Sequence, residues 1–93
     1  MLFTVYCTDK PGAADLRAEN RPAHLAYLDE TACVKLAGPR LSEAGTPTGS
    51  VIVIEVADLA AAQAWADNDP YAKAGVFSGV EVSAFKNVIG PWG

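Results

Sequence analysis

The single histidine of the chain, His24, lies in the stretch "RPAHLAYL" shortly after two arginines. On a helix, Arg17, Arg21 and His24 would follow each other at spacings of four and three residues and share one stripe. Two guanidinium groups beside a titratable ring favour an anion, and the imidazole could act there as a general base. A histidine next to a helical core face can equally be a hydrogen-bonded structural residue, and the arginines can be solvated surface charges.

A second candidate is Asp69, in the stretch "NDPYAKAG". An aspartate directly before a proline is a common helix start, with Asp69 as the cap, Pro70 in the first turn and Gly75 at the end. A capping carboxylate can also hold an imidazole in one orientation. The capping interpretation and the functional interpretation therefore do not exclude each other.

Other chemistries have weaker support. One histidine and two separated cysteines, Cys7 and Cys33, do not have the spacing of a zinc site. The stretch "GTPTGS" lacks the lysine of a phosphate loop, and no glycine-rich dinucleotide motif follows the first apolar segment. Ser42 and Ser50 stand in no nucleophile-elbow motif. We therefore predict no metal, no organic cofactor, and two free structural thiols.

Length and composition restrict the class of protein. The 93 residues are enough for one domain, which we place over 1–93. Apolar residues make up 51% and charged residues 19%, as in globular proteins, and the net charge of −4 disfavours binding to nucleic acid. No apolar run approaches the roughly 18 residues of a membrane span, and the N-terminus has no basic leader. We expect a cytoplasmic protein without membrane contacts.

Apolar patterning and turn residues predict seven elements. In chain order we expect a strand over 2–8, a helix over 13–32, strands over 33–41 and 50–58, a helix over 59–68 capped by Asp58, a very short helix from Pro70, and a strand over 76–89. Pro22 should kink the first helix or restart it. Leu25, Leu28 and Ala32 should face the core, and Gly38 with Pro39 should break the second strand.

The order β-α-β-β-α-β is that of a ferredoxin-like α+β fold, an antiparallel four-stranded sheet with the helices on one face. The stretch "VIVIEV" is apolar on both faces, so a second layer should cover the face without helices. A second copy is the simplest source of that layer. We therefore predict a homodimer packed sheet against sheet, with Trp92 of the apolar tail on the partner.

The stretches "TDKPGA", "RPAHLAYL", "LAGP" and "NDPYAKAGVF" together resemble the YCII-related (YciI-like) family, nearly from end to end. The resemblance implies the ferredoxin-like fold and dimers of the dimeric α/β-barrel kind. It also implies an active site built on a His–Asp dyad, which falls on His24 and Asp69. Characterised relatives include a dehydrochlorinase acting on a chlorinated hydroxyquinol, and muconolactone isomerases are structural relatives.

On this basis we expect a cofactor-independent lyase or isomerase that transfers protons on a small cyclic, anionic or phenolic metabolite. Asp69 would hold Nδ1 of His24, and Nε2 would abstract the proton. Arg17 or Arg21 would bind the negative charge of the substrate, and Tyr71 or Tyr27 would donate a hydrogen bond. The alternatives are a non-catalytic dimeric module that binds a small ligand or another protein, and a cofactorless monooxygenase.

Overall fold

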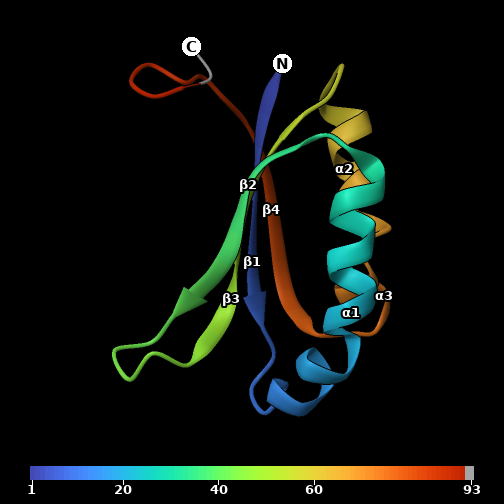
Figure 1. Cartoon of the computed structure of the whole chain (residues 1–93), viewed down its shortest axis with the longest axis vertical. Helices are drawn as coiled ribbons and strands as arrows, with labels where there is room; N and C mark the ends of the chain where they lie inside the picture. Colours follow the sequence, from blue (N-terminus) through green and yellow to red (C-terminus); the bar gives the residue numbers. More distant parts are fainter. Residues whose placement is uncertain (92–93) are drawn as a thin grey trace.

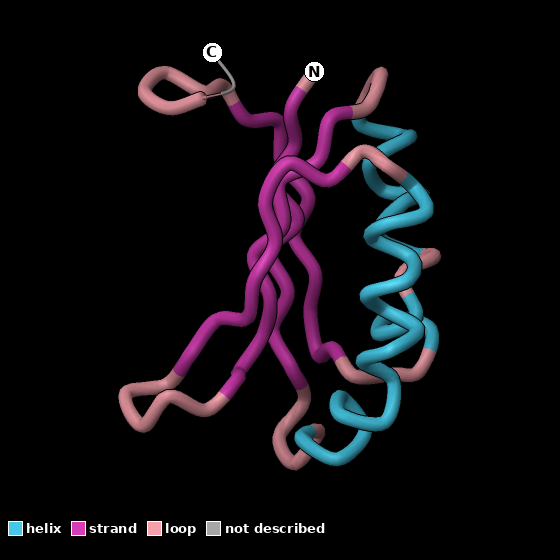
Figure 2. The backbone as a smooth tube through the Cα atoms, viewed as in Figure 1, coloured by secondary structure: helices cyan, strands magenta, loops and turns pink. Residues whose placement is uncertain are grey.

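The computed structural model describes residues 1–91 (Figures 1 and 2). Its elements are β1 (Leu2–Asp9), α1 (Ala14–Thr31), β2 (Val34–Leu41), β3 (Pro47–Glu55), α2 (Leu59–Asp67), α3 (Pro70–Lys73) and β4 (Phe77–Phe85). The strands form one antiparallel sheet in the order β2-β3-β1-β4. This is the predicted ferredoxin-like α+β fold. Trp92, which was expected to contact a partner, lies outside the described residues.

All three helices lie on one side of the sheet, and the other side is left open (Figure 1). Strand alternation directs Phe3, Val5 and Cys7 of β1 and Ile52 and Ile54 of β3 toward the helices, where they are buried. Residues of α2, including Trp65, close this core. Burial raises the pKa of the Cys7 thiol to about 12, so this thiol stays protonated and packs as an apolar group.

The helix α1 continues through Pro22 without a restart, and its first turns lie at an angle to the rest (Figure 1). The predicted core face was wrong in two places. Leu25 is 44% exposed, and Ala32 is exposed at the end of the helix in a left-handed conformation. The residue of α1 that is buried is His24, whereas Leu25 lines the open cavity between α1 and the sheet and therefore stays exposed.

Two strand predictions also need correction. Gly38 and Pro39 do not break β2, since they pair with Val51 and Ser50 of β3. β2 is an edge strand, where a missing backbone N–H can face away from the ladder, so the proline is tolerated. β3 begins at Pro47 rather than at residue 50, and β4 ends at Phe85 rather than at residue 89.

The open face of the sheet carries several exposed large side chains. Tyr6 of β1, Leu36 of β2 and Phe85 of β4 are each about two-fifths exposed in the single chain, at 41%, 45% and 38%. The Arg40 guanidinium lies 4.1 Å from the centre of the Tyr6 ring and donates to the backbone oxygen of Cys7. In residues 1–91 no helix is long and apolar enough to cross a membrane.

Two glycines flank Thr8 on either side of β1, and the structure predicts opposite tolerance to substitution. A methyl group at Gly49 of β3 would overlap the backbone oxygen of Cys7 and lie 3.0 Å from the Arg40 guanidinium. A methyl group at Gly79 of β4 would meet nothing within 4 Å. Gly49→Ala should cost about 1–3 kcal/mol of folding free energy, because the neighbouring backbone must move.

Thermal unfolding of Gly49→Ala and Gly79→Ala checks this prediction. At about 4–8 °C per kcal/mol for a chain of this size, the melting temperature of Gly49→Ala should fall by at least about 4 °C. Gly79→Ala should stay within a few degrees of the wild-type protein. Equal melting temperatures for the two variants would contradict the close approach of β1 and β3.

Candidate active site

His24 and Asp69 meet where the middle of α1 faces the start of α3. Nδ1 of His24 lies 2.8 Å from Oδ1 of Asp69, and the two residues are 6% and 2% exposed. The same carboxylate oxygen accepts the backbone N–H of Tyr71 at 2.9 Å, so Asp69 also caps α3. The structure thus brings together the two residues of the expected dyad, and Asp69 serves both as cap and as histidine partner.

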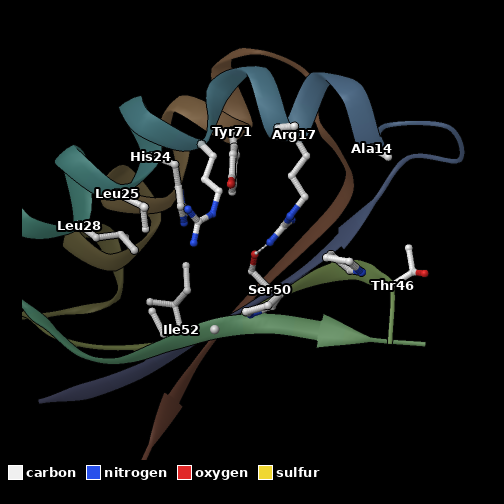
Figure 3. Close-up of a pocket in the computed structure, with 15 residues that line it drawn as sticks. Ala14, Arg17, His24, Leu25, Leu28, Thr46, Ser50, Ile52 and Tyr71 are labelled. Carbon is white, nitrogen blue, oxygen red and sulfur yellow. Dashed lines mark hydrogen bonds between the residues drawn. The ribbon is translucent and has the colours of Figure 1, made fainter. Parts of the chain in front are cut away.

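The orientation of the imidazole follows from this contact. The carboxylate can only accept here, so Nδ1 of His24 is the donor and carries a hydrogen. In the neutral ring the lone pair is then on Nε2, for which no hydrogen-bond partner occurs within residues 1–91. His24 lines a cavity beneath α1, and its side chain points into that cavity (Figure 3). The Asp69 contact thus fixes the tautomer of the neutral ring and leaves a lone pair on Nε2.

Tyr71 stacks against the imidazole. The two ring centres are 3.8 Å apart with an angle of 11° between the planes, and the Arg17 guanidinium lies 4.8 Å from the centre of the Tyr71 ring. Tyr71 stands between His24 and Arg17 (Figure 3). Burial raises the pKa of the Tyr71 phenol above its ordinary value, although the charges of Arg17 and Arg21 act in the opposite direction. The hydroxyl therefore stays protonated and can donate to a ligand.

Arg17 is held by two residues of the sheet. One terminal nitrogen donates to both carboxylate oxygens of Asp9 at 3.0 and 3.2 Å, and the other donates to Oγ of Ser50 at 3.0 Å. The side chains of Arg17 and Asp9 are 12% and 9% exposed, so this is a largely buried ion pair. Asp9 therefore balances the charge of Arg17 and limits its movement.

Arg21 also lines the cavity but is exposed, and its side chain forms no ion pair or hydrogen bond with any residue in the described range 1–91. Of the two arginines predicted to bind an anion, Arg21 is the one whose charge has no direct partner. Arg17 has a fixed position instead. The side chains of the two arginines thus differ in how firmly they are held, although the same helical spacing predicted both as anion-binding residues.

Tyr27 is placed away from the cavity. Its hydroxyl donates to the backbone oxygen of Trp65 at 2.7 Å, and Nε1 of Trp65 donates to Oγ1 of Thr31 at 3.0 Å. These reciprocal bonds fasten α1 to α2. Tyr27 does not line the cavity, so the predicted ligand contact of this residue has no support in the geometry.

The cavity has a volume of about 360 Å³ and lies between α1 and the strands β2 and β3. An apolar cavity of about 150 Å³ can hold benzene, so this one has room for a single substituted ring. Leu25, Leu28 and Ile52 lie near His24, whereas Ser50 and Arg17 lie farther along the cavity (Figure 3). One end is therefore apolar and the other polar.

Sequence reasoning missed Ser50 and Asp9 as members of the site. Ser50 is 2% exposed and faces the helices on β3, in the same alternation as the buried Ile52 and Ile54. The signal that could have identified Ser50 is a serine at an inward-facing position of an otherwise apolar strand. Asp9 ends β1, and only the fold shows that α1 brings Arg17 back to it.

The sequence matches the YCII-related domain over residues 1–86. The chain belongs to this family. The protein YciI of Escherichia coli strain CFT073 is 41% identical, with 95% of this chain and 99% of the relative covered. An uncharacterized protein of Haemophilus influenzae is 36% identical with the same coverage.

A solved structure shares the fold closely. The 5-chloro-2-hydroxyhydroquinone dehydrochlorinase of Burkholderia phenoliruptrix AC1100, in complex with 2,5-dihydroxybenzoquinone, superposes with a TM-score of 0.84 and 35% sequence identity. The match covers 92% of this chain and 94% of that one. This YCII-related chain therefore shares its architecture with an enzyme that processes a small ring compound. Within the described part of the chain, no cluster of three or more His, Cys, Asp or Glu side chains could hold a metal ion.

The Asp69 contact predicts the tautomer of His24. In the neutral ring the hydrogen should reside on Nδ1, and Asp69→Asn should give a mixture of tautomers, because an amide can both donate and accept. Asp58→Asn is the matched control, since Asp58 caps α2 through the N–H of Ala61 without contacting the imidazole. Nitrogen-15 NMR of the imidazole at alkaline pH measures the tautomer in the wild-type protein and in the two variants. A wild-type ring with its hydrogen on Nε2 would contradict the geometry.

Proposed function

We propose that this YCII-related protein is a cofactor-independent enzyme that transfers a proton on a small cyclic metabolite, with His24 as the general base. The observation that carries this proposal is the buried His24–Asp69 contact, which leaves Nε2 directed into a cavity of suitable size. Asp69 acts as the positioning residue. A positioned base of this kind contributes about 10²–10⁴-fold to a reaction rate, which is enough for a modest lyase or isomerase.

The chemical step needs only the residues present. A proton of the substrate passes to Nε2 of His24, and the electron pair that it leaves behind forms a new π bond. In a dehydrohalogenase the halide departs from the neighbouring carbon with its bonding pair, so that one proton and one halide ion are released. In an isomerase the proton returns from His24 to a different carbon. Asp69 stabilises the imidazolium that forms in either case.

The surroundings of His24 support an anionic or phenolic ring as substrate. The unpaired charge of Arg21 would attract a negative group, and the protonated hydroxyl of Tyr71 would donate to a substrate oxygen. Leu25, Leu28 and Ile52 offer apolar contacts for the ring. The chlorinated hydroxyquinol named for the structural neighbour fits this description, so dehydrohalogenation is the first reaction to test.

Turnover should depend on His24. With 5-chloro-2-hydroxyhydroquinone and other hydroxylated rings as substrates, the wild-type protein should release chloride or take up deuterium from solvent. His24→Gln should reduce the rate by about 10²-fold or more, because no base remains. Asp69→Asn should reduce it less, and Asp58→Asn should leave it unchanged.

The same variants separate the enzyme from the alternative, a non-catalytic module that binds a ligand in this cavity. Calorimetry with 2,5-dihydroxybenzoquinone measures binding independently of turnover. An enzyme should show rates that collapse in His24→Gln. A wild-type protein that binds the ring without any turnover across the substrates would contradict the catalytic proposal and favour the binding module.

We further propose that the protein is a homodimer packed through the open face of the sheet. Tyr6, Leu36 and Phe85 are large side chains exposed on that face in the single chain, and the helices leave it uncovered (Figure 1). Burying such side chains against a second copy would add the apolar area that a chain of 93 residues lacks by itself.

A solution mass measurement checks the dimer. Analytical ultracentrifugation should give twice the chain mass of 9.7 kDa at micromolar concentration. Leu36→Lys should shift the protein toward monomer, because it places a charge in the interface. Leu59→Lys on α2 is the matched control, since Leu59 is 46% exposed against 45% for Leu36. A wild-type monomer, or equal masses for both variants, would contradict this interface.

A further inference from the structure

We infer that Ser50 is a hydrogen-bond donor to the ligand, and that the polar end of the cavity therefore selects compounds with an acceptor oxygen there, a carbonyl or an oxyanion. This inference rests on the proposed function, because it assigns a residue and a chemical feature of the ligand to the same cavity. The residues on the helical stripe around His24 do not determine which group of the ligand faces Ser50.

In the hydrogen bond between Arg17 and Ser50, Arg17 is the donor. A guanidinium group has donors and no acceptor, so the 3.0 Å contact must use a lone pair of the serine oxygen. The hydroxyl hydrogen of Ser50 therefore takes no part in the contact with Arg17. It is available for a different acceptor.

Arg17 cannot readily turn away from Ser50. Asp9 holds one of its terminal nitrogens through both carboxylate oxygens, and the Tyr71 ring lies 4.8 Å from the guanidinium carbon. Releasing Arg17 would leave a largely buried carboxylate without its partner, which is costly. The polarity of the Ser50 hydroxyl is fixed by this arrangement, in which Asp9 orients Arg17 and Arg17 orients Ser50.

The hydroxyl that carries the free hydrogen is buried in the cavity wall. Ser50 is 2% exposed and lines the cavity, and within residues 1–91 its hydroxyl donates to no acceptor. A buried hydroxyl hydrogen without an acceptor is unfavourable, so the acceptor has to come from what occupies the cavity. Ser50 and Arg17 lie together at the polar end, with the dashed contact between them (Figure 3).

The chemistry of the neighbours sets the selectivity. Ser50, Arg17 and the protonated Tyr71 all line the cavity with donors, and Arg17 already uses one lone pair of the Ser50 oxygen, so an acceptor oxygen finds more partners at this end than an amine or amide N–H does. A site built from buried donors discriminates strongly against ligands that lack the acceptor. An oxygen that gains negative charge when His24 removes a proton would be held more tightly still, because Arg17 polarises the Ser50 hydroxyl.

Calorimetric titration with 2,5-dihydroxybenzoquinone, a ring rich in acceptor oxygens, tests the assignment on the full chain. Ser50→Ala should weaken binding on the order of tenfold or more, the loss expected for a hydrogen bond to a charged or strongly polar acceptor. Ser78→Ala is the matched control, because it removes the same hydroxyl from an exposed serine of β4 that does not line the cavity. Its affinity should stay within about twofold of the wild-type value, and melting temperatures verify that each variant is folded.

Asp9→Asn separates a ligand donor from a residue that merely positions Arg17, since it loosens Arg17 and keeps the hydroxyl. It should weaken binding less than Ser50→Ala does. Equal losses in Asp9→Asn and Ser50→Ala, or a Ser50→Ala protein that binds like the wild type, would overturn the inference. In the latter case a collapse of turnover in His24→Gln would still uphold the proposed function.

If the wild-type protein does not bind the quinone, a neutron structure of the ligand-free protein tests the direction of the Ser50 hydroxyl hydrogen. The Ser50 hydrogen should then point to an ordered water on the cavity side. A hydrogen directed at a protein acceptor would overturn the assignment, whatever the reaction of the enzyme proves to be.

Discussion

The site depends on one buried contact, the hydrogen bond between Nδ1 of His24 and the carboxylate of Asp69. A carboxylate that is 2% exposed is costly to bury unless its oxygens are satisfied. Here the imidazole and the backbone N–H of Tyr71 supply two donors to one oxygen. The contact therefore fixes the imidazole and at the same time joins α1 to the start of α3. It also brings Tyr71 into the stack on His24.

A second consequence is that α1 does not pack tightly on the sheet along its whole length. The helix buries His24 where its apolar pattern would have buried Leu25, and the space beneath it stays open as a cavity of about 360 Å³. Leu25 remains 44% exposed at the rim. The buried ion pair of Arg17 and Asp9 supports the other end of the same space. Because α1 does not fill this space with its own side chains, there is room for a ligand.

Much of the fold followed from local signals, because strand alternation, the Asp58 and Asp69 caps and the turn residues act over short distances. The stretch "NDPY" alone was enough to predict that Asp69 caps a helix. It does not identify His24 as the partner of Asp69, because the two residues are 45 positions apart, and only the family resemblance joined them. The continuity of β2 through Pro39 depends on its place at the sheet edge, which composition does not reveal. The contact of Ser50 with Arg17 and the ion pair of Asp9 with Arg17 required the tertiary structure, as did the position of Tyr27 against Trp65.

A crystal structure of the protein soaked with 2,5-dihydroxybenzoquinone tests the central claim most directly. The ring should lie in the cavity under α1 with one of its atoms within about 3 Å of Nε2 of His24, while Nδ1 remains on Asp69. A ring bound elsewhere, or an imidazole that has left Asp69 and points to solvent, would contradict the assignment of His24 as a base held by Asp69.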